Sequence, residues 1–450
     1  MENKSTSYTY LIFLHVIIGV IVFAIPLLSK IYALIIPVVG FYLVIRNKNS
    51  NHEVILVSAY LVGVEVFLRM TGGNLNNEYI KLCVIIFMII GMLYKNFAMG
   101  SLIYGLFLLL LIPGILVARE IAEVNFDTDL KKAIMFNLSG PVCLGIASLY
   151  MYKRRILFTD LQKILKVMGL PIISTVVYLF LFNPSIKDVV TGTQSNFETS
   201  GGFGPNQVST ILGLGMFVFF SQLVLFSKSK GMIFLNGILF VFITYRGLAT
   251  FSRGGIITGV AMIVCLIMIL YLFSNAMGKA KVSIVIALSF FAGLAIWGYT
   301  SMQTRGLIEK RYANKDARGR EKKDRLGGRE AIMDADYELF LENPIMGIGV
   351  GIGKELRKES LGQEVASHNE ITRMISEHGL FGIFGLFILF LTPFTLYINN
   401  RQHLYFLSFF VFWMLTINHA AMRIAAPAFI YSLSLLSVQI KNPEKTESPH

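Results

Sequence analysis

Long, uninterrupted apolar segments dominate this sequence and restrict what it can fold into. Each is long enough to cross roughly 30 Å of hydrocarbon as a helix of about 20 residues. The apolar residues are consecutive rather than alternating, which excludes a transmembrane β-barrel. We predict fourteen helical spans, with twelve as the alternative, at about residues 9–28, 31–45, 54–70, 79–94, 98–117, 133–151, 160–182, 206–226, 231–246, 254–275, 281–300, 378–397, 403–418 and 424–440. The fold class expected is therefore an all-α polytopic membrane protein.

The composition agrees with this class. Hydrophobic residues make up 55% of the 450 residues and charged residues only 15%, whereas a soluble protein averages about 25% charged residues.

Two of the predicted spans, 31–45 and 403–418, are short enough to be re-entrant or interfacial instead.

The distribution of charge predicts the orientation in the membrane. Residues 301–378 hold 14 basic and 14 acidic residues, so the whole net charge of +13 lies elsewhere in the chain. Under the positive-inside rule, basic clusters between spans mark the cytoplasmic side. These clusters are Arg46 with Lys48, Lys153 to Arg155, Lys228 with Lys230, and Lys279 with Lys281. Both termini are then cytoplasmic, and the long polar loop is extracytoplasmic.

The predicted organisation is one membrane domain interrupted by that loop. Residues 1–300 hold the first eleven helices, residues 301–377 form one large extracytoplasmic loop with short helices, and residues 378–450 hold the last helices and a cytoplasmic tail. Within the loop, residues 303–328 carry both charge signs without apolar periodicity and are expected to be solvated. An amphipathic helix is predicted over residues 329–340, ending at Asn343-Pro344.

Several functional classes are disfavoured. The three cysteines, Cys83, Cys143 and Cys265, all lie in apolar spans, so we expect neither a disulfide framework nor a zinc site. The basic balance belongs to membrane topology, and no nucleic-acid partner is expected. The glycine series from Gly347 to Gly353 follows no strand of a nucleotide-binding fold. It is better explained as a turn whose backbone approaches substrate or another segment.

His368 is the candidate catalytic residue. Ser367 to Glu370 fits a Ser-x-x-Glu capping box, which predicts His368 at the first position of a helix. The positive end of that helix disfavours an imidazolium, so the ring should remain neutral and able to accept a proton. A general base needs that property near neutral pH. An isolated histidine is more often an ordinary surface residue, and His378 is a weaker rival without such a cap.

Arg246 and Arg253 flank a short turn predicted on the same side of the membrane. Such arginines can simply reach lipid phosphates at the interface. The alternative is that their guanidinium groups grip a pyrophosphate, for which the planar fork of arginine is better shaped than lysine.

Three groups of residues, taken in order, carry a family resemblance. They are Ser252-Arg253-Gly254-Gly255; Gly328-Arg329 followed by Phe340, Asn343-Pro344 and Gly347-Ile348-Gly349; and His368-Asn369 followed by Glu377, Gly379 and Gly382. Together they resemble the O-antigen ligase and O-antigen polymerase superfamily, membrane glycosyltransferases that use polyprenyl-pyrophosphate-linked glycans. The resemblance covers about residues 200–390.

The resemblance implies an inverting, metal-independent and cofactor-free transfer of a glycan. The donor is an undecaprenyl-pyrophosphate-linked glycan, and the acceptor is the hydroxyl of a lipid or polysaccharide, as in lipopolysaccharide synthesis. Transfer would take place among membrane lipids, at the outer face of the bacterial cytoplasmic (inner) membrane.

The resemblance also implies roles for particular residues. His368 would activate the acceptor, while Arg253 and Arg329 would bind the pyrophosphate, with Arg246 a weaker candidate for the same anion. Asn206, Asn369 and Glu377 are possible supporting residues.

Two alternatives remain at this stage. The residues do not separate a ligase from a repeat-unit polymerase. A membrane transporter would be a different class, but transporters carry ionisable groups near the midplane of the bilayer. Here the middles of the spans are mostly apolar apart from Glu65. We therefore favour glycan transfer.

Overall fold

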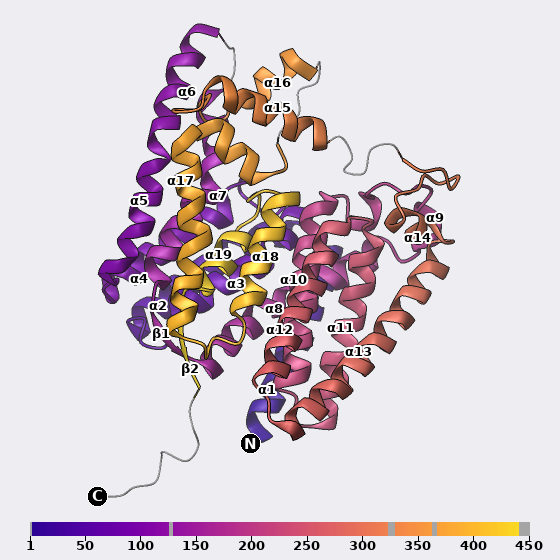
Figure 1. Cartoon of the computed structure of the whole chain (residues 1–450). Helices are drawn as coiled ribbons and strands as arrows, with labels where there is room; N and C mark the ends of the chain where they lie inside the picture. Colours follow the sequence, from indigo (N-terminus) through magenta and orange to yellow (C-terminus); the bar gives the residue numbers. More distant parts are fainter. Residues whose placement is uncertain (1, 126–128, 323–328, 362–366, 441–450) are drawn as a thin grey trace, which may run out of the picture.

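The computed structural model describes residues 2–125, 129–322, 329–361 and 367–440, and α-helices make up nearly all of its regular structure (Figure 1). The first part of the chain forms α1 (Glu2–Ala24), α2 (Leu27–Asn47), α3 (Glu53–Met70), α4 (Tyr79–Tyr94), the 3-10 helix η1 (Met99–Ser101), α5 (Leu102–Leu110), α6 (Ile112–Asn125) and α7 (Leu130–Met151). The middle part forms the strand β1 (Arg155–Leu157), α8 (Phe158–Phe182), α9 (Ile186–Val189), the 3-10 helix η2 (Glu198–Ser200), α10 (Pro205–Leu225), α11 (Lys230–Ala249), α12 (Arg253–Leu272) and α13 (Ala276–Gln303). The last part forms α14 (Leu307–Tyr312), α15 (Arg329–Glu342), α16 (Gly353–Leu361), α17 (Glu370–Asn399), α18 (Phe406–His419), α19 (Ala426–Leu433) and the strand β2 (Ser437–Gln439).

The all-α polytopic membrane class is confirmed. Among the described residues, ten helices are long and apolar enough to cross a membrane, and α4 and α18 are shorter apolar helices. The predicted short span at 31–45 is part of the full-length helix α2, whereas the one at 403–418 is the 14-residue helix α18. The predicted tail beyond residue 440, and residues 323–328 of the charged segment, lie outside the described residues.

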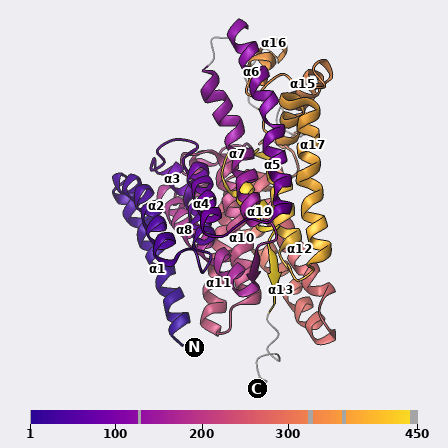
Figure 2. The same cartoon turned by 90° about the vertical axis from the view of Figure 1, so that its left-hand side faces the viewer.

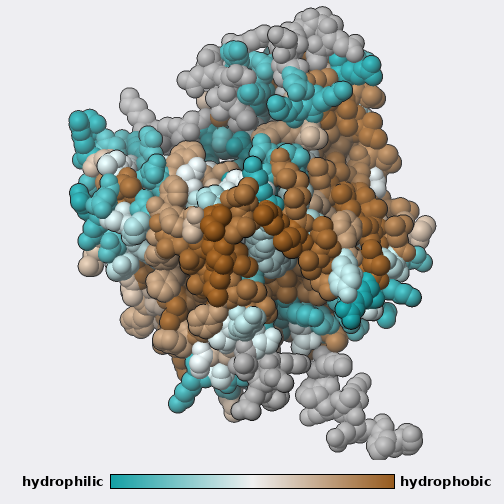
Figure 3. All heavy atoms as spheres, turned by 180° about the vertical axis from the view of Figure 1, so that it is seen from behind, coloured by the Kyte–Doolittle hydropathy of each residue, from teal (hydrophilic) through white to brown (hydrophobic). Residues whose placement is uncertain are grey.

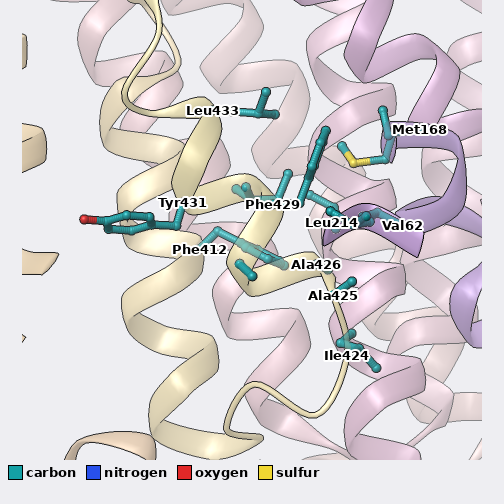
Figure 4. Close-up of a cluster of buried hydrophobic side chains, with 14 of the residues drawn as sticks. Val62, Met168, Leu214, Phe412, Ile424, Ala425, Ala426, Phe429, Tyr431 and Leu433 are labelled. Carbon is teal, nitrogen blue, oxygen red and sulfur yellow. The ribbon is translucent and has the colours of Figure 1, made fainter. Parts of the chain in front are cut away.

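The prediction of a last span over residues 424–440 is wrong. The helix there, α19, has only 8 residues, and at 1.5 Å per residue it is about 12 Å long, too short to cross the hydrocarbon. The chain then leaves the helix and forms β2, which pairs in parallel with β1. Figure 4 shows why the segment nevertheless has an apolar sequence. Side chains of α19 such as Phe429 are packed with Val62, Met168 and Leu214 from α3, α8 and α10.

The two ends of the bundle differ. The start of α1 and the β1–β2 pair lie at one end, and α14, α15 and α16 lie at the other (Figures 1 and 2). In Figure 3 a broad hydrophobic band lies between hydrophilic surfaces at the two ends, as expected for a protein surrounded by lipid. We call the end that carries α14 to α16 the loop end and the opposite end the terminal end.

Helices α10 and α12 approach each other unusually closely. A Cβ atom on Gly213 of α10 would lie 2.0 Å from the carbonyl oxygen of Gly255 in α12, and one on Gly255 would lie 2.2 Å from the carbonyl oxygen of Ser209 in α10. Only glycine permits such backbone contact, as in small-residue interfaces between transmembrane helices. This contact lies beside the first turn of α12 and fixes where that helix begins.

Helix α17 is kinked near its beginning. Gly379 has φ 58° and ψ −136°, a conformation favourable only for glycine. The amide of Leu380 donates to the carbonyl of Pro344 at 2.8 Å, so the Asn343-Pro344 turn that ends near α15 packs against the kink. The part of α17 before the kink starts eight residues earlier than the predicted span and belongs to the loop end.

Candidate functional site

The first turn of α12 holds Arg253 at the loop end of the bundle. The hydroxyl of Ser252 donates to Oδ1 of Asn206 at 2.8 Å and accepts from the hydroxyl of Ser209 at 2.9 Å. Phe251 is a non-glycine residue with φ 57°, which is a sparsely populated conformation. Asn206 therefore fixes the turn that leads into Arg253.

A second arginine reaches this turn from α14. Nε of Arg311 donates to the carbonyl of Phe251 at 2.9 Å, and Nη1 of Arg253 donates to the carbonyl of Arg311 at 3.4 Å. Burial lowers the pKa of Arg311, and the positive charges of Arg253 and Arg329 lower it further. Arg311 therefore lies within the electrostatic field of both other arginines.

Arg329, the first residue of α15, is the third arginine of the group. Burial lowers its pKa and the charge of Arg253 lowers it further. Helix α15 is fastened to its surroundings by Asp336, which accepts from Thr372 of α17 at 2.9 Å and forms a buried ion pair with Arg357 of α16.

We call Arg253, Arg311 and Arg329 the arginine cluster. Arg253 and Arg329 are each the first residue of a helix, where unsatisfied backbone amides carry partial positive charge. Positive charges that destabilise one another electrostatically are stabilised by an anion between them, and arginine is suited to phosphate groups. The cluster is therefore a candidate binding site for a phosphate or pyrophosphate.

The loop between α18 and α19 connects the arginine cluster to His368. The amide of Ala421 donates to the carbonyl of His368 at 3.1 Å, and Nη2 of Arg423 donates to the carbonyl of Ser367 at 3.4 Å. Burial lowers the pKa of Arg423, and the charge of Arg329 lowers it further. Arg423 thus lies between the arginine cluster and the segment that carries His368.

That loop is held by the ionisable pair of α3. Glu65 accepts from Arg69 at 2.6 Å and from the amide of Ala425 at 2.7 Å, and Arg69 also donates to the carbonyl of Arg423 at 3.0 Å. Glu65, the one ionisable residue noted near the middle of a span, is therefore hydrogen-bonded within the protein.

The predicted capping box at Ser367 is wrong by two residues. Helix α17 begins at Glu370, and its cap is Asn369, whose Oδ1 accepts from the amides of Ile371 and Thr372 at 2.9 and 3.4 Å. Asparagine is as good an N-cap as serine, and the Glu370 carboxylate pairs with Arg373 instead. His368 consequently lies in the connection before the cap and is partly exposed, so the helix-end argument for a neutral ring does not apply.

Asn369 also ties this connection to α18. Its Nδ2 donates to Oδ1 of Asn418 at 3.2 Å. The neighbouring His419 is a second imidazole at the site that the sequence interpretation missed. Its Nδ1 lies 2.8 Å from the carbonyl of Leu415, which only accepts, so Nδ1 donates there. His419 lies beside Gly254, where an added Cβ would be 2.4 Å from its ring.

Arg246 does not join the arginine cluster. It is completely buried, and its guanidinium donates to the carbonyls of Asn183, Leu179 and Thr199 at 3.1, 2.8 and 3.4 Å. An arginine near a helix end can be satisfied by main-chain oxygens as well as by an anion. In this structure the Nη1 and Nη2 atoms of Arg246 therefore have a structural role, and its contact with a pyrophosphate stays a prediction.

Glu377 supports the glycine segment rather than a ligand. Its Oε2 accepts from Arg373 at 2.5 Å, and its Oε1 accepts from the amide of Gly351 at 3.0 Å. His378 is fully buried next to the kink.

The glycine segment from Gly347 to Gly353 packs its backbone against other helices. Gly349 and Gly351 have φ 86° and 82°, and a Cβ on Gly349 would lie 2.5 Å from the backbone nitrogen of Ala118 in α6. The amide of Val350 donates to the carbonyl of Gly114 at 3.0 Å. The sequence predicted that the backbone of this glycine segment approaches substrate or another segment. In the structure it approaches other segments of the protein.

A polar cavity of about 560 Å³ lies next to the His368 connection. It is bounded by the first turns of α7, by the glycine segment, by α16 and by Ser367, and its lining includes Lys132, Phe136 and Lys354. The guanidinium of Arg423 lies 5.8 Å from the centre of the Phe136 ring. Arg423 therefore contacts two residues that line the cavity, Ser367 and Phe136, and it also lies within the electrostatic field of Arg329.

A second polar cavity, of about 360 Å³, lies between Thr191 to Asn196 and the Asp316 to Lys322 region. Burial lowers the pKa of Lys322, and the charges of Arg311 and Arg253 lower it further. This cavity therefore borders the arginine cluster on another side. Within the part of the chain that the structure describes, no group of three or more His, Cys, Asp or Glu side chains could hold a metal ion.

Comparison with known proteins gives one family. Residues 238–387 match the family model described as O-antigen ligase. No curated protein matches the chain. The matched segment includes the arginine cluster and His368.

Proposed function

We propose that this multi-pass membrane protein belongs to an O-antigen ligase-like family of glycosyltransferase-type enzymes that use lipid-linked polysaccharide, and the match over residues 238–387 supports this. We further propose that it transfers a glycan from undecaprenyl pyrophosphate to an acceptor hydroxyl. Transfer takes place at the outer face of the bacterial cytoplasmic membrane, with the loop end outside. The basic residues at the terminal end support this orientation.

The convergence of Arg253, Arg311 and Arg329 is the observation that carries the proposal. In the proposed complex these guanidinium groups, together with the first amides of α12 and α15, bind the pyrophosphate of the donor. The same groups stabilise the charge that develops on the pyrophosphate as it leaves, which is the larger contribution to catalysis. The polar cavity beside Lys322 has the hydroxyl and amide groups that a donor glycan requires.

His368 is proposed as the general base. The acceptor lies in the cavity lined by Phe136, Lys132 and Ser367, so that its hydroxyl reaches the neighbouring His368. The ring takes the hydroxyl proton while the acceptor oxygen forms a bond to the anomeric carbon. The bond from that carbon to the pyrophosphate oxygen breaks, and undecaprenyl pyrophosphate leaves. A single displacement inverts the anomeric configuration and requires no metal.

Ligase and polymerase differ only in the acceptor. A ligase transfers the glycan to a different molecule, whereas a polymerase transfers it to a second carrier-linked repeat unit. The same arginine cluster and base serve both reactions, so the polymerase remains the alternative.

The test is an in vitro reaction with the purified protein. It is incubated with an undecaprenyl-pyrophosphate oligosaccharide and either a lipid A-core or a second carrier-linked oligosaccharide, and product size is followed on a gel. One glycan added to the acceptor supports a ligase, and a ladder of carrier-linked chains supports a polymerase. No product with either acceptor, together with movement of the lipid-linked glycan across a vesicle membrane, would support transport instead.

A further inference from the structure

A basic cavity lies at the terminal end, on the opposite side of the membrane domain from the arginine cluster. It has a volume of about 360 Å³ and is formed by three connections, those between α2 and α3, between α4 and η1, and between α7 and β1. Its lining includes the basic residues His52, Lys95, Lys153, Arg154 and Arg155 and contains no carboxylate. We call it the terminal-end cavity.

The Arg154 side chain and the backbone of this cavity are held in place. The guanidinium of Arg154 stacks on the ring of Tyr150 at 3.9 Å, and its Nε donates to the Tyr150 carbonyl at 2.9 Å. The strand pair fixes the backbone, because the amide of Lys153 donates to the carbonyl of Leu435 and the amide of Ser437 donates to the carbonyl of Arg154, both at 2.9 Å. The Arg154 guanidinium is thus fixed, and Lys153 and Arg155 extend as exposed side chains from a backbone that the strand pair holds.

No carboxylate is among the described residues that line the cavity, although Asp160 and Glu53 lie near His52. Burial lowers the pKa of His52, and the charges of Lys95 and Arg154 lower it further, against the opposing effects of Asp160 and Glu53. The Glu53 carboxylate already accepts from the amide and the side chain of Asn51 at 3.0 and 3.1 Å. The buried Nδ1 of His52 has no hydrogen-bond partner among the residues that the structure describes.

Apolar side chains lie beside the same cavity. Leu93, Phe97 and Met99 are 81%, 44% and 77% exposed, and they flank or belong to the connection that contributes Lys95. The apolar helices α4 and α5 end and begin here, so the cavity is at the level of the lipid headgroups. An anion that also carries acyl chains can contact both the basic cavity and the apolar side chains beside it.

We propose that the terminal-end cavity binds the phosphate headgroup of an anionic phospholipid, with the acyl chains lying against Leu93, Phe97 and Met99. Basic cavities between transmembrane helices bind such headgroups through lysine and arginine. The site is separate from the proposed transfer site and does not depend on the transfer reaction.

The test measures lipid binding to the full chain in detergent by native mass spectrometry, with melting temperature as a second reading. The probes are phosphatidylglycerol, phosphatidylcholine and inorganic phosphate. Wild type is compared with Lys95→Ala/Lys153→Ala. The matched control is Lys228→Ala/Lys230→Ala, which removes the same charge from exposed residues of the predicted cytoplasmic side, outside the cavity lining.

We expect saturable binding of phosphatidylglycerol to wild type and to the control, and binding at least about tenfold weaker in the cavity variant. If the double cavity variant does not fold, Lys153→Gln, at an exposed side chain, gives the same comparison with a smaller loss. Equal weakening in the control, equal binding of phosphatidylcholine, or inorganic phosphate that binds as tightly as the lipid would each overturn the proposal.

Discussion

The contact between α10 and α12 gives a direct way to disturb the proposed site without touching a proposed catalytic group. In Gly255→Ala, the new Cβ would lie 2.2 Å from the carbonyl carbon and oxygen of Ser209. Ordinary contact between such atoms needs about 3.5 Å, so the two helices must separate by roughly 1 Å. The bond of 2.9 Å from Ser209 to Ser252 would then break. Because Arg253 follows Ser252, its guanidinium would move with the turn.

The size of the effect follows from this displacement. A misplacement of 1 Å in a positioning group lowers catalysis by about 100-fold, and overpacking costs about 1 to 3 kcal/mol of stability. The assay is the transfer reaction with the undecaprenyl-pyrophosphate donor, run beside a thermal melt of the same preparation. We expect a folded protein with a lower melting temperature and about 100-fold slower transfer.

The matched control is Gly293→Ala in α13, where an added Cβ meets no atom within 4 Å. It should transfer at the wild-type rate. If Gly255→Ala does not fold, Ser209→Ala removes the bond to Ser252 without added volume and should slow transfer several-fold. A folded Gly255→Ala protein with the wild-type rate would refute the argument that this helix contact positions Arg253.

The remaining predictions concern the arginines and the requirement for a metal ion. Arg253→Lys and Arg329→Lys should each lower kcat/KM by about 10- to 100-fold, because lysine keeps the charge but loses the bidentate fork. Steady-state kinetics with varied donor concentration would measure this loss. The comparison variant Arg246→Lys should mainly lower the melting temperature, since the partners of Arg246 are buried carbonyls. A specific loss of donor affinity in this variant would contradict a structural role for Arg246. Arg311→Gln should raise the donor KM by at least about tenfold, and unchanged kinetics would remove this residue from the cluster. Transfer should persist in EDTA, and a loss that divalent ions restore would exclude the metal-independent mechanism.

The sequence was most informative where hydrophobic burial determines the structure. Long consecutive apolar runs located most of the membrane helices, because a helix is the structure in which a span satisfies its own backbone in lipid. They failed at α19, since a short helix buried among α3, α8, α10 and α18 has the same apolar composition as a lipid-exposed span. A helix buried inside the protein and a helix surrounded by lipid have nearly the same apolar sequence.

The candidate site was only partly predictable for a different reason. Arg253 and Arg329 could be assigned to one side of the membrane by counting spans. Arg311 lies in a charged segment without periodicity, so nothing local distinguished it from its neighbours. Arg246 shows a second reason, because its proximity to a helix end predicted an anion, while the fold supplies carbonyl partners for its Nη1 and Nη2 atoms from α8 and the segment after it. Which partner satisfies an arginine depends on tertiary contacts.

The general base is the central claim, and its most direct test compares His368→Ala with His419→Ala. Both proteins, and wild type, are purified and given the undecaprenyl-pyrophosphate oligosaccharide with its acceptor, and the initial rate of product formation is measured at saturating donor. We predict that His368→Ala remains folded, binds the donor as wild type does, and loses transfer by at least about 100-fold, while His419→Ala retains measurable transfer. A His368→Ala protein that transfers at the wild-type rate, or a loss confined to His419→Ala, would contradict the account.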